Sequence, residues 1–322
     1  MDESRCWTAT TAVREIVLNG HRIADDQPAY VIAEIGHNHG GKFDTARQMI
    51  LAAAAAGANA VKLQKRTNQT LYTQALLDAP YENENSYGKT YGQHRQALEF
   101  GTKEYLACRS VALAAKVDFF ATAFDEDAAD FLMAVDVPAF KLASSSLGDD
   151  PLLRHVAGYG KPIILSTGGG CWGDVDHAVN VLANHSAPFA LLHCTAGYPV
   201  TNIAELNLLA IVEMKARYPE VVIGWSGHDP GVSLALVAYA YGARIIEKHF
   251  TLNRASKGTD QAFSLEPRGM QVLCEDLKKA HVAKGDGIKR VYDSELKPLA
   301  KMRRVLTPQG RQVTGEIVYE RH

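Results

Sequence analysis

The stretch from Tyr30 to Ala56 reads YVIAEIGHNHGGKFDTARQMILAAAAA, and it joins an apolar run to a helical pattern through a polar loop. The run Tyr30 to Ile35 predicts a buried strand, and Phe43 to Ala56 predicts a helix. Similar apolar runs, each followed by a helical pattern, recur along most of the chain. Continuously apolar strands that alternate with helices predict a parallel sheet that is buried on both faces.

Eight strand–helix units can be counted in the sequence. The expected strands are 30–35, 60–64, 118–123, 139–143, 162–166, 189–194, 221–224 and 244–249. The expected helices are 43–56, 103–116, 126–135, 151–159, 174–185, 204–218, 231–241 and 268–283. Eight units predict an α/β fold of the closed (β/α)8 TIM barrel type. An open, doubly wound sheet is the alternative, because periodicity alone does not show that the sheet closes.

We expect the barrel to occupy residues 28–285, between a short N-terminal extension and a C-terminal tail. The extension, residues 1–27, contains the turn dipeptide Asn19-Gly20 and predicts a short hairpin. The tail, residues 286–322, contains a strand-like segment at Glu316 to Tyr319. A long polar insertion, Lys65 to Gly101, carries four tyrosines, and loops of this length are usually functional.

The composition excludes several classes of protein. With 47% hydrophobic and 22% charged residues, the 322-residue chain is not disordered, collagen-like or a coiled coil. A net charge of -2 gives no overall attraction to nucleic acid or to an anionic membrane. The five cysteines are scattered, and no signal peptide or membrane-spanning run is visible. These features predict a cytoplasmic protein with reduced thiols that binds neither nucleic acid nor membrane.

Polar residues follow the expected strands at their carboxyl ends, where the active site of a TIM barrel lies. Lys62 and Gln64 are two residues apart and therefore share one face of their strand. The other candidates at strand ends are Glu34, Thr122, Lys141, Ser144, Ser166, Tyr198, His228 and His249.

Lys62 and Lys141 fall inside strands, where a lysine is costly to bury without a negative partner. Two such lysines near strand-end hydroxyls favour a shared anionic ligand that carries phosphate and carboxylate groups. The alternative is a buried pair within the protein, such as Lys62 with Glu34.

His228 and His249 lie at the ends of neighbouring strands and suit a divalent cation such as Mn, Fe, Co or Zn. The alternative is a pair of hydrogen-bonding histidines, and His37, His39 and His193 compete as ligands. The run Gly168 to Gly170 is a weak phosphate-loop signal, and turn chemistry is its simpler explanation.

The chain resembles the N-acetylneuraminate (sialic acid) synthase family, which condenses phosphoenolpyruvate with an amino-sugar aldehyde. The resemblance runs in family order over about residues 28–290. The matching stretches are AEIGHNHGG (33–41), AVKLQ (60–64), FKLAS (140–144), ILSTG (164–168), LHCT (192–195), GHD (227–229), EKHFTL (247–252), KGTD (257–260) and GDGIKR (285–290).

The resemblance implies a role for each candidate residue. Lys62, Thr122, Lys141, Ser144 and Ser166 would bind the phosphate and carboxylate of phosphoenolpyruvate. His228 and His249 would hold the metal, expected to be Mn2+ with Mg2+ or Co2+ as alternatives. Glu34, Gln64, Tyr198 and Asp260 would contact the sugar and assist proton movement. Glu34, both lysines and both histidines would thus carry the catalysis, and a homodimer is expected.

The chain departs from the family pattern in three places. A glutamate that usually helps to hold the sugar is replaced by Ser146, and Thr259 stands where several relatives have proline. The tail resembles only the opening of the family's C-terminal antifreeze-like domain, which lends an arginine to the partner's site. We therefore expect a truncated tail, an intact donor site and an altered acceptor site.

Three functions remain open from the sequence. The first is a metal-dependent synthase acting on N-acetylmannosamine or a related amino sugar. The second is a phosphoenolpyruvate-dependent synthase with a different aldehyde acceptor in specialised metabolism. The third is a non-catalytic barrel that binds phosphosugars. Retention of both lysines and both histidines argues against the third function, because unpaired buried lysines would destabilise an idle barrel.

Overall fold

The computed structural model describes residues 14–185 and 187–316. The chain divides into two compact units between His281 and Val282. The first unit includes the barrel together with the described part of the expected extension, and the second begins four residues before the predicted start of the tail at residue 286. Cys6 lies outside the described residues.

Eight parallel strands form a closed barrel in the order β10-β3-β4-β5-β6-β7-β8-β9. The barrel is closed by the last strand, β10, which pairs with β3 on one side and with β9 on the other. The structure therefore confirms the predicted closed barrel over the open sheet. The strands are β3 (Tyr30–Gly36), β4 (Ala60–Lys65), β5 (Asp118–Ala123), β6 (Phe140–Leu142), β7 (Ile163–Ser166), β8 (Phe189–Cys194), β9 (Val222–Gly227) and β10 (Ile245–His249).

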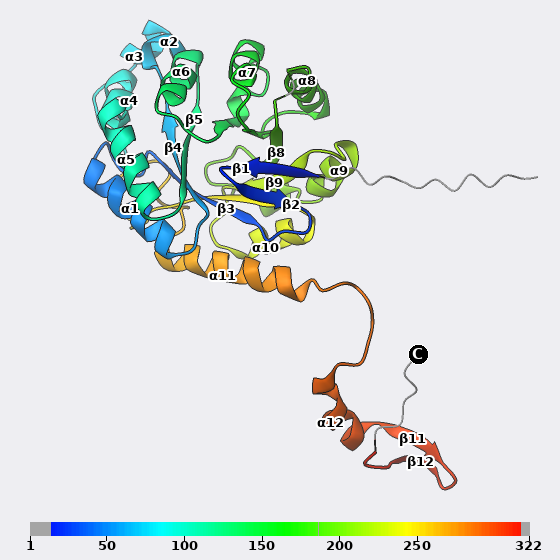
Figure 1. Ribbon diagram of the computed structural model, residues 1–322. Helices are drawn as coiled ribbons and strands as arrows, with labels where there is room; N and C mark the ends of the chain where they lie inside the picture. The colour runs from blue at the N-terminus through cyan, green and yellow to red at the C-terminus, as the bar shows by residue number, and fades with distance from the viewer. Residues whose placement is uncertain (1–13, 186, 317–322) are drawn as a thin grey trace, which may run out of the picture. The chain divides into compact units, whose positions relative to one another are not determined.

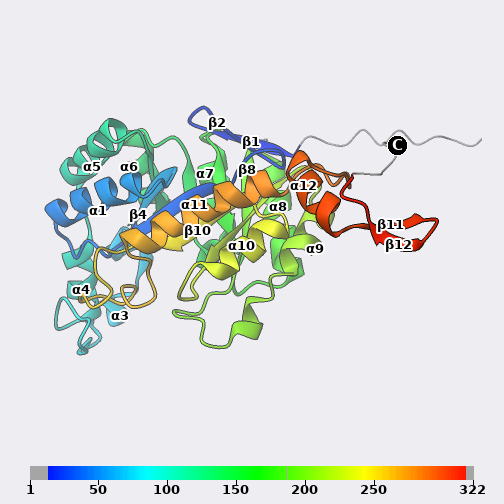
Figure 2. The ribbon, with the colours of Figure 1, turned by 90° about the horizontal axis from the view of Figure 1, so that it is seen from below.

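Helices cover the outside of the barrel and bury their apolar faces against it (Figure 1). They are α1 (Phe43–Ala55), α5 (Thr102–Ala114), α6 (Glu126–Ala134), α7 (Asp150–Ala157), α8 (Trp172–Ala183), α9 (Ala210–Arg217), α10 (Ser233–Ala240) and α11 (Pro267–Ala283). In Figure 2, α10 and α11 lie next to each other near β10, and the Tyr239 hydroxyl lies 3.0 Å from Nδ1 of His281. None of the described helices is long and apolar enough to cross a membrane.

Most element boundaries differ from the prediction by only one or two residues, but two differences are larger. The helix expected over 204–218 is divided into a 3-10 turn, Ile203–Leu206, and α9, because Asn207 adopts a left-handed conformation with φ 39°. Strand β9 continues to Gly227, three residues beyond the prediction. Its added residues Trp225 and Ser226 pair with β8 and β10, and this pairing is not visible in the local sequence.

The hairpin predicted at Asn19-Gly20 is present as β1 (Glu15–Leu18) and β2 (His21–Ala24). Asn19 donates to the carboxylate of Asp118 at 2.6 Å, and the Tyr30 hydroxyl donates to the same carboxylate at 2.5 Å. Asp118 and Tyr30 begin their strands. The hairpin therefore lies at the amino ends of the strands and leaves the carboxyl ends free for a site.

The insertion after β4 folds into three short helices: α2 (Asn68–Leu71), α3 (Gln74–Asp78) and α4 (Tyr91–Leu98). The second unit contains α12 (Asp293–Met302) and the hairpin of β11 (Arg304–Thr307) with β12 (Gly310–Val313). The strand predicted at Glu316 to Tyr319 is wrong at Glu316, which lies in a bend, and the rest lies outside the described residues.

Candidate active site

A cavity of about 830 Å3 opens at the carboxyl ends of the barrel strands. All eight strands, or the loops that follow them, contribute residues to its lining. Alternate residues of each strand point into the barrel, and the inward-pointing residues nearest the carboxyl ends surround the cavity. Every residue predicted for the site lines this cavity: Glu34, Lys62, Gln64, Thr122, Lys141, Ser144, Ser166, Tyr198, His228, His249 and Asp260.

Lys62 is buried inside a group of polar partners from neighbouring strands. Its Nζ lies 2.7 Å from a carboxylate oxygen of Glu34 and donates to the Thr122 hydroxyl at 2.7 Å. A second carboxylate, Glu247, lies 3.6 Å away. The alternative of an internal Lys62–Glu34 pair is therefore correct for this lysine, which nonetheless faces the cavity.

Glu34 and Glu247 are both fully buried but differ in protonation behaviour. Burial raises the pKa of Glu34 to about 6, despite the opposing effect of Lys62. Burial acts in the same direction on Glu247, but the charges of Lys62 and Lys141 outweigh it and lower the pKa of Glu247. Glu34 also accepts a hydrogen bond from Gln64 Nε2 at 2.7 Å. Of these two carboxylates, Glu247 is therefore favoured in its ionised form, and Glu34 has a pKa of about 6.

Lys141 has a different environment from Lys62. Its Nζ donates to the Ser166 hydroxyl at 2.7 Å and to the carbonyl of Leu142 at 2.9 Å. No carboxylate of the described residues lies within 4.0 Å of this ammonium group. Burial lowers the pKa of Lys141, so a negative ligand beside it would be strongly favourable.

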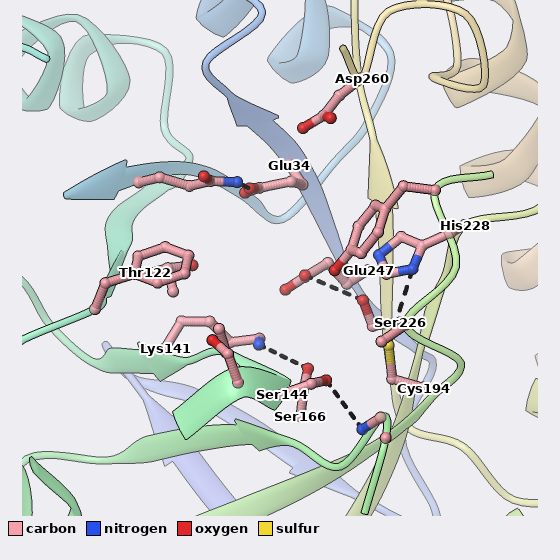
Figure 3. Close-up of a pocket in the computed structure, with 18 of the residues that line it drawn as sticks. Glu34, Thr122, Lys141, Ser144, Ser166, Cys194, Ser226, His228, Glu247 and Asp260 are labelled. Carbon is pink, nitrogen blue, oxygen red and sulfur yellow. Dashed lines mark hydrogen bonds between the residues drawn. The ribbon is translucent and has the colours of Figure 1, made fainter. Parts of the chain in front are cut away.

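Backbone and hydroxyl groups next to Lys141 add to an anion-binding surface. The Ser144 hydroxyl accepts from the Gly168 amide at 2.9 Å, and Gly168 to Gly170 line the cavity just before α8 begins. A Cβ on Gly168 would approach Ser144 Oγ to 2.9 Å, so this glycine permits the close approach. Figure 3 shows Lys141, Ser144 and Ser166 together at one end of the pocket, with Glu34 and Asp260 toward the other.

His228 and His249 lie next to each other in the lining of the same cavity, with ring centroids 5.3 Å apart in an edge-to-face arrangement. Nδ1 of His228 lies 3.0 Å from the carbonyl of Thr195, which leaves Nε2 for a ligand. Nδ1 of His249 is buried without a hydrogen bond and lies 3.6 Å from a carboxylate oxygen of Asp260. Burial lowers the pKa of His228 to about 4, so the ring is neutral at pH 7.

Two neutral imidazoles with free nitrogens fit a divalent cation, which binds histidine only in its neutral form. Among the described residues, no group of three or more His, Cys, Asp or Glu side chains converges to hold a metal. A cation here would have two histidine ligands and would take its remaining ligands from substrate and water.

The competing histidines lie in other environments. His37 lines the cavity but is buried against Glu99 at 3.5 Å. His39 stacks on Phe100, and His193 lies 2.7 Å from the carbonyl of Leu206; neither lines the cavity. The tyrosines of the insertion also lie outside the lining, as does Ser146, which is buried elsewhere.

Several lining residues were assigned no role in the site from the sequence. Glu247 shares a strand face with His249, two residues on, so the strand alternation could have found it. Ser226 donates to Glu247 at 3.2 Å but lies beyond the predicted end of its strand. Arg66 and Arg95 also line the cavity, and no local pattern marks them because they reach it from the insertion.

The family model described as the NeuB family matches residues 49–289, which include most of the barrel and its site. The chain belongs to the NeuB family. It is 39% identical to an N-acetylneuraminate-9-phosphate synthase of Drosophila melanogaster over 76% of this chain and 66% of that protein. It is 34% identical to an N,N'-diacetyllegionaminic acid synthase of Campylobacter jejuni over 90% of this chain and 87% of that protein.

A solved structure supports the same assignment for this NeuB family member. The sialic acid synthetase of Leptospira borgpetersenii, crystallised with citrate, superposes with a TM-score of 0.76 at 34% identity, covering 89% of this chain and 95% of that one. These relatives are synthases, and as a member of their family the chain is an enzyme. The predicted resemblance is thereby confirmed.

Proposed function

We propose that this NeuB family enzyme condenses phosphoenolpyruvate with an amino-sugar aldehyde and releases phosphate. The observation that carries the proposal is the arrangement of Lys62 and Lys141 with His228 and His249 around one cavity. The names of the relatives, which are synthases of sugar acids, support the same reaction class.

The donor binds where Lys141, Ser144 and Ser166 lie together. Lys141 and the hydroxyls are donors to the oxygens of a phosphate or carboxylate, and Lys62 completes the positive surface. Anchoring both reactants before the reaction turns a bimolecular encounter into a local one.

The reaction forms one carbon–carbon bond and one carbon–oxygen bond, the latter from water, and it breaks the carbon–oxygen bond to phosphate. The aldehyde oxygen takes up a proton and becomes a hydroxyl group. The third carbon of phosphoenolpyruvate attacks the aldehyde carbon, water adds to the second carbon, and phosphate leaves to give a 2-keto-3-deoxy acid. Glu34, whose pKa burial raises to about 6, would accept the proton released by the attacking water. Asp260 and Tyr198 line the cavity beside the histidines and would position the sugar.

His228 and His249 would hold the divalent cation, for which Mn2+ is our first choice. When bound, the cation supplies Lewis-acid polarisation of the aldehyde carbonyl. The buried Nδ1 of His249, which has no hydrogen bond, and the neutral ring of His228 support this role.

The direct test follows phosphate release from phosphoenolpyruvate with Mn2+ and a panel of aldoses. We expect turnover with at least one amino sugar and its loss in a His228→Ala, His249→Ala double variant that keeps its thermal stability. Metal-dependent turnover in the double variant would refute the metal assignment. No turnover with any acceptor, together with no phosphoenolpyruvate binding by calorimetry, would favour a non-catalytic barrel.

A further inference from the structure

Two arginines outside the donor site reach into the same cavity from the insertion after β4. Arg66 directly follows β4, and Arg95 lies in α4. Arg66 is buried, with 7% of its surface exposed, and its Nε and Nη1 have no hydrogen-bond partner. A buried guanidinium with free donors is costly unless an acceptor meets it.

No carboxylate of the described residues pairs directly with either of these two charges. Arg66 donates only from Nη2, to the neutral Gln64 side chain at 2.8 Å, and its guanidinium stacks 3.6 Å above Phe124. Arg95 donates from Nε to the Tyr91 hydroxyl at 2.8 Å. Neither guanidinium forms an ion pair within 4.0 Å with a carboxylate of the described residues, although Lys62 and Lys65 both do. Burial and the positive charge of Arg95 lower the pKa of Arg66, although Glu99 acts in the opposite direction. Burial also acts to lower the pKa of Arg95, but nearby groups that include Asp260 raise it. The two guanidinium groups therefore repel each other, and no carboxylate of the described residues contacts either of them directly.

The arginine pair is separated from the donor lysines by a chain of polar contacts. Arg66 contacts Gln64, Gln64 contacts Glu34 at 2.7 Å, and Glu34 in turn contacts Lys62. Glu34 lies toward the opposite end of the pocket from Lys141 and Ser144 (Figure 3). The cavity therefore contains two cationic regions, and a single phosphoenolpyruvate at Lys141 leaves the arginine region without an anion.

We infer that the acceptor carries its own negative group, a phosphate ester or a carboxylate, which Arg66 and Arg95 bind. This inference rests on the proposed function and adds the class of the second substrate. Arginine suits such a group because its planar fork donates two parallel hydrogen bonds to a phosphate or carboxylate. The names of the relatives differ in this respect: that of the Drosophila melanogaster synthase includes a phosphate, whereas that of the Campylobacter jejuni synthase does not.

Three acceptors with the same ring test the inference: N-acetylmannosamine, its 6-phosphate, and N-acetylmannosaminuronic acid. Consumption of phosphoenolpyruvate with Mn2+ gives kcat/KM for each. We expect a charged acceptor to exceed the neutral one at least tenfold, and the preferred charged acceptor identifies phosphate or carboxylate as the group. Arg66→Gln and Arg95→Gln should each lower kcat/KM for that acceptor about 10- to 100-fold, from lost charge-assisted hydrogen bonds.

Two controls separate recognition from folding. Arg66→Lys keeps the charge and should retain more activity than Arg66→Gln, whereas Arg109→Gln, on an exposed arginine paired with Asp136, should change nothing. The KM for phosphoenolpyruvate should stay within about twofold in all variants, because the arginines lie outside the donor site. An equal loss for charged and neutral acceptors in Arg66→Gln would overturn the inference.

The inference and the proposed function fail in different ways. A neutral acceptor that is used best, with no dependence on Arg66, overturns the inference and leaves the synthase reaction standing. If no acceptor is consumed, the proposed function fails. Calorimetry with the 6-phosphate and the uronic acid then decides the inference separately: binding weakened by Arg66→Gln supports it, and no binding of either compound refutes it.

Discussion

At the scale of single residues, the two buried lysines differ in what neutralises them. Lys62 has the carboxylate of Glu34 at 2.7 Å, whereas Lys141 has only a hydroxyl and a carbonyl. A ligand anion would therefore gain most from Lys141, because no protein carboxylate competes for it. Lys62 would also face the donor but would add less to its binding, because Glu34 already pairs with it.

The first prediction concerns this difference. Lys141→Met should weaken phosphoenolpyruvate binding about 10- to 100-fold, since it removes the charge-assisted hydrogen bonds to the donor. Calorimetric titration with phosphoenolpyruvate measures the effect. Lys161→Met, on a surface lysine paired with Asp136, is the control and should bind normally. Unchanged affinity in Lys141→Met would contradict the donor assignment.

At the scale of elements, the strands bring the site together only where neighbouring backbones approach closely. Gly224 in β9 is such a place, because an added Cβ would lie 2.4 Å from Leu192 Cδ2 and 2.6 Å from the carbonyl of Ile245. The Ile245 carbonyl belongs to the backbone of β10, and the Leu192 side chain is buried in the core. Strand β9 leads directly to Ser226 and His228, so its position also sets theirs.

The second prediction follows from that contact. Gly224→Ala should lower the free energy of unfolding by about 1–3 kcal/mol through overpacking. Gly148→Ala is a suitable control, because its Cβ would meet nothing within 4 Å. Urea denaturation of both variants compares them directly, and equal midpoints would show that β9 can shift without cost.

At the scale of the whole molecule, the barrel buries several histidines in neutral form. Burial lowers the pKa of His39 to about 3, and it lowers the pKa values of His37 and His94 to about 4. In the unfolded chain these rings protonate near pH 6.5. Acid therefore favours unfolding: the stabilisation from neutral rings is present above about pH 6.5 and is lost as the pH falls toward the folded-state values.

The third prediction quantifies this effect for His39, which is only 2% exposed. One pH unit corresponds to about 1.4 kcal/mol for a group that binds a proton only in the unfolded chain. Between pH 6.5 and 5 the free energy of unfolding should therefore fall by about 2 kcal/mol from this residue alone. His39→Gln should flatten the dependence of the unfolding free energy on pH by that amount. His185→Gln, at an exposed position, is the control. A slope unchanged by His39→Gln would refute the assignment.

Much of the site could be predicted because its residues follow local rules. Apolar runs and their helices established eight strand–helix units, and the rule that strand ends carry the active site selected Lys62, Lys141, His228 and His249 from the sequence. Each apolar run and the polar residues at its end lie within a few residues of one another along the chain, so they can be recognised without knowledge of the fold.

The tertiary structure decided what depends on residues far apart in sequence. Closure of β10 on β3 placed Glu247 beside Lys62, so that Lys62 shares two carboxylates and Lys141 has none within 4.0 Å among the described residues. Packing of the insertion placed Arg66 and Arg95 in the cavity, although neither lies at a recognisable strand-end position. Such contacts form only when backbone segments that are far apart in sequence come within reach of each other's side chains. Burial then determines the electrostatic cost of each charge. Neither the distance between these segments nor the degree of burial can be read from the local sequence.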